Sequence, residues 1–199
     1  MIKAVIFDCF GVLLGNTYLN SLADLQAKDP AAADELRAVN HATDMGILGR
    51  DESLKLMGDL LGTTAEALNK QQDEGEVRNE PLLAFIAELK ARRTHKIGLL
   101  SNIMSRERLD VRFEEGRLDS LFDVIVPSGD VGYIKPQPEI YILTAQQLGV
   151  APEECLFIDD IIDFCKGAEA VGMQAIHFTS THQAIQDVQH LIDWGEKKD

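Results

Sequence analysis

Short runs of apolar and β-branched residues recur along the chain, separated by longer segments with helical periodicity. Such runs are typical of strands that are buried on both faces, as in a parallel sheet. Strands that alternate with helices at this spacing are joined by right-handed crossovers, so helices cover the sheet. The sequence therefore predicts an α/β fold. The expected strands are residues 3–8, 96–101, 122–127, 155–159 and 173–178.

The segment between the first two expected strands is too long for a simple crossover. Residues 16–93 have helical patterning throughout, and Pro30 and Pro81 each stand where a helix begins. We expect an inserted α-helical cap subdomain over the carboxyl ends of the strands. The predicted domains are therefore a core of residues 1–15 and 94–199 and a cap of residues 16–93.

The helices expected after the second strand follow from periodicity and from stop signals. Gly149 and Gly172 stand where two of them would end. The expected helices run over about residues 105–115, 138–148, 160–171 and 183–194, and Trp194 is expected to belong to the core.

Composition excludes some classes of partner. The 199 residues carry a net charge of −14 with a pI near 4.7, which argues against nucleic acid and anionic membrane surfaces as partners. No stretch matches a signal peptide or a membrane span. The cysteines Cys9, Cys155 and Cys165 are scattered and odd in number, so we expect a reduced, cytoplasmic protein. The sequence gives no indication of the oligomeric state.

Polar residues stand at the carboxyl ends of the expected strands, where open α/β sheets bind ligands. Asp8 ends the first strand, and Gly11 lets the backbone turn and approach a ligand. The other polar positions are Ser101 and Asn102, Lys135, and Asp159 and Asp160, with Asp163 nearby. Taken one at a time, a serine or aspartate here could simply cap a helix, and a lysine could be a solvated surface charge.

Four motifs in this order resemble the haloacid dehalogenase-like (HAD) hydrolase superfamily over essentially the full chain. They are VIFDCFGVL around Asp8, LLSN at Ser101, GYIKPQPEIY around Lys135, and LFIDD at Asp159 followed by GAEAVGM. The resemblance implies a Rossmann-like parallel sheet with a helical cap of the first type. It is nearest to the branch of small sugar-phosphatase-like enzymes and the N-terminal domain of soluble epoxide hydrolase.

The resemblance also implies a role for each matched residue. Asp8 would be the nucleophile, Ser101 would hydrogen-bond the transferred group, and Lys135 would neutralise developing charge. Mg²⁺ would be the cofactor, since hard oxygen ligands suit it. The implied metal ligands are Asp8, the backbone carbonyl of Phe10, and Asp160, with Asp159 in support and Asp163 as a weaker candidate. The implied substrate site comprises Phe10, Gly11, Ser101, Asn102 and Lys135, and the substrate would be a small phosphorylated molecule.

The chain departs from the family pattern at two positions. Phosphatases of this superfamily usually carry a second aspartate two residues after the nucleophile, where this chain has Phe10. A positioned general acid contributes about 10² to 10⁴ in rate, so Phe10 implies either a slow phosphatase or another acid. Phe164 stands where relatives often have Asn or Asp.

Three functions remain open from the sequence. A Mg²⁺-dependent phosphatase is favoured by Asp159 and Asp160, because clustered carboxylates require a cation. A haloacid dehalogenase is the alternative, since those enzymes carry an aromatic residue at the position of Phe10. A HAD fold that binds a ligand without turnover is the third. In the cap, Arg37 and Arg50 could contact an anion or form surface ion pairs.

Overall fold

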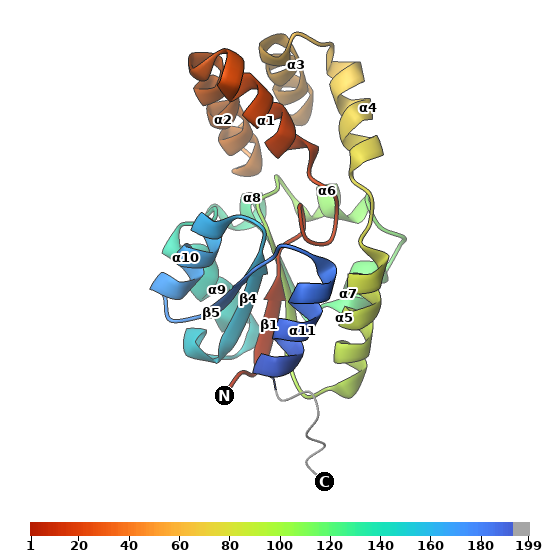
Figure 1. Cartoon of the computed structure of the whole chain (residues 1–199), viewed down its shortest axis with the longest axis vertical. Helices are drawn as coiled ribbons and strands as arrows, with labels where there is room; N and C mark the ends of the chain where they lie inside the picture. The colour runs from red at the N-terminus through yellow and green to blue at the C-terminus, as the bar shows by residue number, and fades with distance from the viewer. Residues whose placement is uncertain (193–199) are drawn as a thin grey trace.

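The computed structural model describes residues 1–192 and confirms the predicted α/β fold. The described residues form a parallel sheet of five strands in the order β3-β2-β1-β4-β5, so the first strand lies at its centre (Figure 1). The strands are β1 (Ala4–Phe7), β2 (Lys96–Ser101), β3 (Val124–Pro127), β4 (Cys155–Asp159) and β5 (Gln174–His177).

The central strand is fully buried because helices cover both of its faces. Side chains alternate between the faces of a strand, so Val5 and Phe7 join one hydrophobic cluster while Ala4 and Ile6 join the other. The first face is covered by α5 (Glu80–Arg92) and α11 (Thr181–Leu191), and the second by α9 (Pro138–Leu148) and α10 (Ile162–Ala170).

A separate bundle of helices lies beyond the carboxyl ends of the strands, at the top of Figure 1. Its small hydrophobic core is made by Leu36, Leu54, Met57 and Leu68. This bundle is the cap, and the carboxyl ends of the strands face it. Its helices are α1 (Thr17–Lys28), α2 (Pro30–Asp44), α3 (Arg50–Leu61) and α4 (Ala65–Gly75).

The boundary between cap and core differs from the predicted one at residue 93. Helix α5 lies beside the sheet, and Leu82, Ile86 and Leu89 belong to the larger sheet cluster rather than to the cluster of the cap. The chain therefore returns to the core before α5, at about residues 76–79. The sequence pattern shows an apolar helix face, but it does not show which layer covers that face.

The segment after β2 also differs from prediction. The expected helix over 105–115 is only α6 (Arg106–Asp110), and a turn separates it from α7 (Arg117–Leu121). A further short helix, α8 (Ser128–Val131), and a 3-10 turn, Pro152–Glu154, complete the core. Trp194 and the predicted end of the last helix lie outside the described residues.

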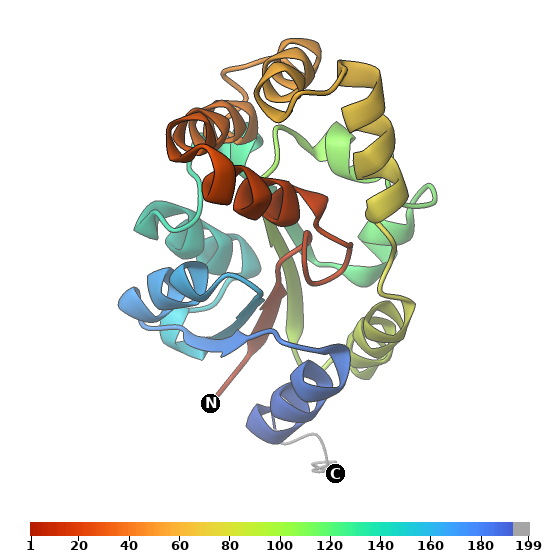
Figure 2. The ribbon, with the colours of Figure 1, turned by 45° about the horizontal axis from the view of Figure 1, so that its top comes forward.

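Figure 2 shows the cap helices above the core from a second direction. Hydrogen bonds hold the chain in place where the two parts meet. Asn79 Nδ2 donates to the carbonyl of Val12 at 2.9 Å, next to the point where the chain leaves the cap. Ser128 Oγ donates to the carbonyl of Asp44, the last residue of α2, at 2.6 Å. Among residues 1–192, no helix has both the length and the apolar character needed to cross a bilayer.

Candidate active site

A buried lysine lies between two carboxylates at the ends of β1 and β4. Lys135 Nζ is 2.6 Å from Asp8 Oδ1 and 2.6 Å from Asp159 Oδ2. All three side chains are almost completely enclosed. Strands β1 and β4 pair in parallel with Phe7 opposite Ile158, so the residues that follow these two, Asp8 and Asp159, are brought side by side. The three residues matched to separate motifs thus meet in one place.

The charges of this cluster do not balance on their own. Burial raises the pKa of Asp8 above its ordinary value; Lys135 opposes that rise and Asp159 adds to it. Burial alone would lower the pKa of Lys135, but Asp159 and Asp8 hold it above its ordinary value. One ammonium group faces at least two carboxylates, which favours the arrival of another cation.

Three carboxylates could hold that cation. Oxygen atoms of Asp8, Asp159 and Asp160 all lie within 4.8 Å of one another. Asp160 Oδ1 is buried and has no hydrogen-bond partner among residues 1–192. Burial raises the pKa of Asp160 to about 6, and Asp159 contributes to the rise. An unpartnered buried oxygen in a set of hard oxygen donors fits Mg²⁺.

The loop after β1 is shaped to admit Asp160. Gly11 has a φ of +96°, and a Cβ atom on it would lie 2.0 Å from Asp160 Oδ2. Only glycine allows this approach, because any side chain would displace the carboxylate. The expected turn at Gly11 is therefore the feature that lets the first and fourth motifs meet.

Asp159 and Asp160 have different surroundings. Asp159 Oδ1 accepts a hydrogen bond from the backbone N–H of Ile161 at 2.8 Å, and its other oxygen binds Lys135. His177 Nε2 lies 3.0 Å from the carbonyl of Asp160 and steadies that segment. Both side-chain oxygens of Asp159 thus have partners and position the lysine, which leaves Asp160 with the free oxygen.

Ser101 and Asn102 occupy the end of β2 with distinct surroundings. Ser101 Oγ is buried and has no partner within the described chain, so it is available to a ligand. Asn102 Nδ2 donates to the carbonyl of Lys135 at 3.1 Å, and its Oδ1 accepts from the N–H of Lys135 at 2.9 Å. Asn102 therefore fixes the backbone that carries the lysine.

Two aromatic rings flank the lysine. Lys135 Nζ lies 5.0 Å from the ring centre of Phe164 and 5.5 Å from that of Phe157. Cation–π attraction in such a desolvated position stabilises the ammonium group. Phe164, the second departure from the family pattern, therefore contacts Lys135 with a ring instead of a carboxylate or amide.

Phe10 lines the cavity beside Asp8 and has no proton to donate. The guanidinium of Arg112 lies 5.2 Å from the centre of its ring. Cys9, the neighbour of Asp8, is buried, and burial together with Asp8 raises the pKa of its thiol well above the ordinary value. A neutral thiol is a poor nucleophile, which leaves Asp8 as the nucleophile candidate in this loop.

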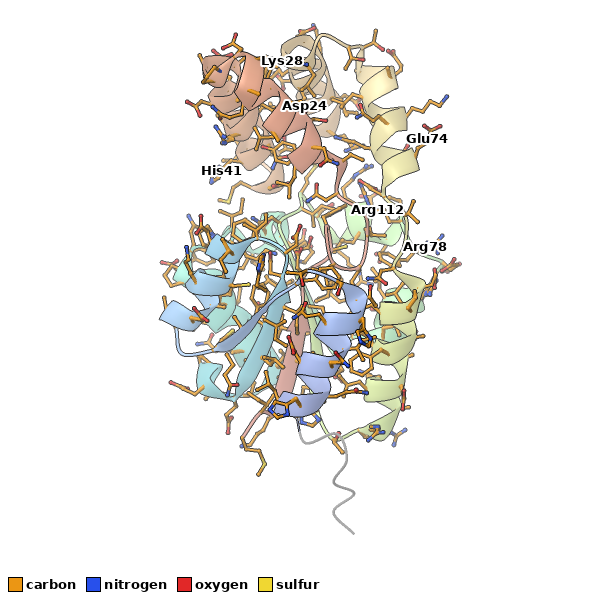
Figure 3. All side chains as sticks on the ribbon, viewed as in Figure 1. Asp24, Lys28, His41, Glu74, Arg78 and Arg112 are labelled. Carbon is orange, nitrogen blue, oxygen red and sulfur yellow. The ribbon has the colours of Figure 1, made fainter. Side chains whose placement is uncertain are left out.

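A cavity of about 210 Å³ extends from Asp8 and Lys135 into the cap. Arginines form much of its charged wall: Arg50 comes from the cap, and Arg108 and Arg112 come from the core segment after β2. Figure 3 shows Arg112 at the level where cap and core meet. A protein of strongly negative net charge thus concentrates cations at the entrance to its carboxylate cluster.

These arginines are only partly neutralised. Arg112 binds Glu76 through Nε and Nη2, whereas Arg50 Nη2 binds the neutral amide of Asn69 at 2.6 Å. Burial lowers the pKa of Arg50, and the charges of Arg108 and Arg112 lower it further. Within the described residues no carboxylate forms an ion pair with Arg108. The wall therefore favours an anionic group in the cavity.

Two residues considered from the sequence lie elsewhere. Asp163 is exposed and pairs with Lys166 at 2.9 Å, so the structure does not bring it into the carboxylate cluster. Arg37 pairs with Asp34 on the outside of the cap and does not line the cavity, whereas Arg50 does.

Sequence reasoning did not find Asp44, Arg108 and Arg112, which all line the cavity. Arg108 and Arg112 are four residues apart shortly after Ser101, a spacing that places two side chains on one helix face. That spacing was the available signal for the arginines. Asp44 ends a cap helix four residues after Asn40, and no motif marks it.

Comparison with known proteins identifies the family of this chain. The model of the haloacid dehalogenase-like hydrolases matches residues 2–172. Phosphatase MT3486 of Mycobacterium tuberculosis is 38% identical over 84 residues, which are 42% of this chain and 39% of that protein. The chain thus matches about two fifths of the length of that relative.

Two further matches cover nearly the whole chain. The phosphorylated carbohydrates phosphatase of Thermotoga maritima is 28% identical over 97% of this chain and 91% of its own length. The HAD family enzyme bt-2542 of Bacteroides thetaiotaomicron has the same fold, with a TM-score of 0.71 at 19% identity over 96% of this chain and 98% of that one. With the family model matched over most of its length, this chain belongs to the haloacid dehalogenase-like hydrolases.

Proposed function

We propose that the protein is a phosphatase that hydrolyses a small phosphate monoester through a phosphoryl group carried by Asp8, with Mg²⁺ as cofactor. The observation that carries this proposal is the cluster of Asp8, Asp159 and Asp160 around one lysine, with a buried Asp160 oxygen left without a partner in residues 1–192. The phosphatases among the matched proteins support the same reaction class.

The residues of this chain divide the reaction between them. Asp8 attacks phosphorus through one carboxylate oxygen, and the bond from phosphorus to the leaving oxygen breaks. Lys135 and the hydroxyl of Ser101 stabilise the charge on the transferred oxygens. Water then attacks phosphorus and releases phosphate from Asp8. Asp159 and Asn102 keep Lys135 in position through the contacts described above.

Magnesium would be held by Asp8 and Asp160, with Asp159 supporting them. When bound, it supplies positive charge that offsets the surplus of carboxylates and draws an anionic phosphoryl group to the nucleophile. Carboxylate oxygens are the ligands that Mg²⁺ prefers. Asp8, Asp159 and Asp160 supply them without Asp163.

The cavity wall indicates the kind of leaving group. Arg50 from the cap and Arg108 from α6 of the core both line the cavity that reaches Asp8 and Lys135. Guanidinium groups bind carboxylate and phosphate oxygens strongly. We infer that the substrate carries a second negative charge on its leaving group, in addition to the phosphoryl group that is transferred.

The dehalogenase alternative is less consistent with the cluster. Halide leaves without a proton, so Phe10 would be no handicap. A carboxylate cluster with a free buried oxygen on Asp160 has no task in that reaction, and its burial without a cation would be unfavourable. The non-catalytic alternative leaves the enclosed Asp8 and Lys135 equally without a task.

The test is release of phosphate from nitrophenyl phosphate, with Mg²⁺ and with chelator. An aryl leaving group needs little protonation, so Phe10 does not mask the activity. We expect turnover that depends on Mg²⁺, is abolished in Asp8→Asn and is retained in Asp24→Asn, an exposed cap residue. Halide release from 2-haloacids without phosphate release would establish the dehalogenase, and ligand-dependent stabilisation without any product would establish a binding protein.

A further inference from the structure

Phe10 leaves the proposed reaction without a proton donor at its usual position. An alkoxide is a poor leaving group, so hydrolysis of an alkyl phosphate needs an acid close to the leaving oxygen. That oxygen lies on the side of the phosphoryl group opposite Asp8, which is the side of the cap. A replacement acid is therefore expected on the cavity wall that the cap contributes.

Asp44 is the aspartate that the cap places on this wall. It is the last residue of α2 and lines the same cavity as Asp8 and Lys135. The core fixes its backbone, because Ser128 Oγ donates to the Asp44 carbonyl at 2.6 Å. Ser128 is itself fully buried, and its Oγ accepts a hydrogen bond from the N–H of Ile103 at 2.9 Å. Asp44 is thus held where cap and core meet, not on a free helix end.

The side chain of Asp44 has one oxygen in use and one available. Asn40 Nδ2 donates to Asp44 Oδ2 at 2.8 Å and orients the carboxyl group. Asp44 Oδ1 has no hydrogen-bond partner among residues 1–192. This arrangement is that of an acid with a fixed orientation and one oxygen ready to exchange a proton with a ligand.

The surroundings of Asp44 keep its proton in place at neutral pH. Burial raises the pKa of the carboxyl to about 8, although the nearby charge of Lys135 and the hydrogen bond from Asn40 act against the rise. The groups that face it are Tyr18 from α1, Asn40 from α2 and Lys135 from the core. The pKa of Tyr18 is itself raised to about 12, first by burial and then by Asp44, so its phenol stays neutral.

We propose that Asp44 is the general acid of the reaction and takes the place of the aspartate that Phe10 replaces. This proposal rests on the proposed phosphatase function. Asp44 gives its proton to the leaving oxygen as the bond from that oxygen to phosphorus breaks and the bond from Asp8 to phosphorus forms. The alcohol departs, and Asp44 is left as a carboxylate.

The second half of the reaction restores the acid. The Asp44 carboxylate takes a proton from water as the water oxygen bonds to phosphorus. The bond between phosphorus and the Asp8 oxygen breaks, and its electron pair returns to Asp8. Phosphate leaves, Asp44 is again protonated, and no further reactant is consumed.

The experiment compares two substrates in Asp44→Asn. A nitrophenyl leaving group departs without a proton, whereas an alkyl phosphate such as glycerol phosphate requires one. Because Asp44 also takes a proton from water in the second half of the reaction, which both substrates share, the rate compared is that of leaving-group release in the first turnover. We expect Asp44→Asn to lower this rate for the alkyl phosphate by about 10² to 10⁴-fold and to change it for the aryl phosphate less than about threefold. The matched control is Asp34→Asn on the same helix, whose carboxylate is exposed; it should leave both rates unchanged.

The outcomes separate this proposal from the phosphatase proposal itself. Equal loss on both substrates, or no loss on either, in folded Asp44→Asn would overturn the role of Asp44 while the wild-type activity stands. Absence of phosphate release by the wild type on both substrates would overturn the proposed function. Asp44→Ser, a smaller polar side chain, is measured in parallel, so the result does not depend on the folding of one variant.

Discussion

Arg112 and Glu76 join the core to the cap through two parallel hydrogen bonds. Arg112 Nε lies 2.6 Å from Glu76 Oε2, and Arg112 Nη2 lies 2.9 Å from Glu76 Oε1. Their side chains are only 9% and 12% exposed, so the pair is shielded from solvent. Because Arg112 also lies over the ring of Phe10, the pair connects the end of α4 to the loop that carries the nucleophile.

The first prediction concerns this ion pair. Glu76→Gln leaves the Arg112 guanidinium buried without its counter-charge, which should lower the free energy of unfolding by about 3 kcal/mol. The matched control is Glu74→Gln, whose partner Lys70 lies 3.7 Å away in an exposed pair; it should cost less than about 0.5 kcal/mol. Urea denaturation measures both, and equal effects of the two variants would contradict the structural role of the pair.

The second prediction concerns the metal ligands. Asp160→Asn removes the unpartnered oxygen, so the Mg²⁺ concentration for half-maximal activity should rise at least about tenfold, since even residues around metal ligands have effects of that size. Asp163→Asn should leave the Mg²⁺ concentration for half-maximal activity unchanged, because Asp163 pairs with Lys166 at the surface. Thermal stabilisation by MgCl₂ provides a readout independent of activity. A larger effect of Asp163→Asn than of Asp160→Asn would contradict the assignment of Asp160 as the metal ligand.

The third prediction concerns the pH dependence of stability at Asp44. Its pKa is about 8 in the folded protein and near the ordinary value of 3.8 when unfolded. Between pH 3.8 and pH 8 the Asp44 carboxyl therefore keeps a proton in the folded state that it has lost in the unfolded state. The stabilisation that this difference gives is complete below pH 3.8 and is lost as the pH rises towards 8. The free energy of unfolding of the wild type minus that of Asp44→Asn should fall from pH 5 to pH 8. A constant difference would show that the carboxyl is not shifted.

The fourth prediction concerns the arginines of the cavity. Arg50→Met should raise KM about tenfold for phosphoglycerate, whose carboxylate it would bind, and change KM little for glycerol phosphate, which lacks that charge. Arg37→Met is the control, because Arg37 pairs with Asp34 outside the cavity. The same KM increase for both substrates would mean that Arg50 supports the cap and does not recognise a second anion.

Much of the fold and part of the site could be predicted from local patterns. The strands were predictable because central parallel strands are apolar on both faces, and the residues at their ends mark one edge of the sheet. Asp8, Lys135 and Asp159 were predicted by motif, and the structure places them in contact. Gly11 was predicted as a turn, but its contact with Asp160 requires the pairing of β1 with β4.

The rest depends on how the cap packs. Helix α5 has an apolar face like the cap helices, and only its packing on the sheet shows that it belongs to the core. Asp44 and Arg112 carry no motif and reach the cavity only because the fold places both the end of α2 and the segment after α6 on its wall. Arg37 and Arg50 were equivalent in sequence terms, and the fold of the cap separates them.

The central claim is that Asp8 carries the phosphoryl group, and rapid quenching tests it most directly. The enzyme is mixed with excess nitrophenyl phosphate and Mg²⁺, denatured in acid during the first turnover, and its peptides are analysed by mass spectrometry. We predict that the peptide containing Asp8 gains the mass of one phosphoryl group in the wild type and in Asp24→Asn, and gains nothing in Asp8→Asn. Turnover with no phosphorylated peptide, or a phosphoryl group on a different residue, would contradict the account.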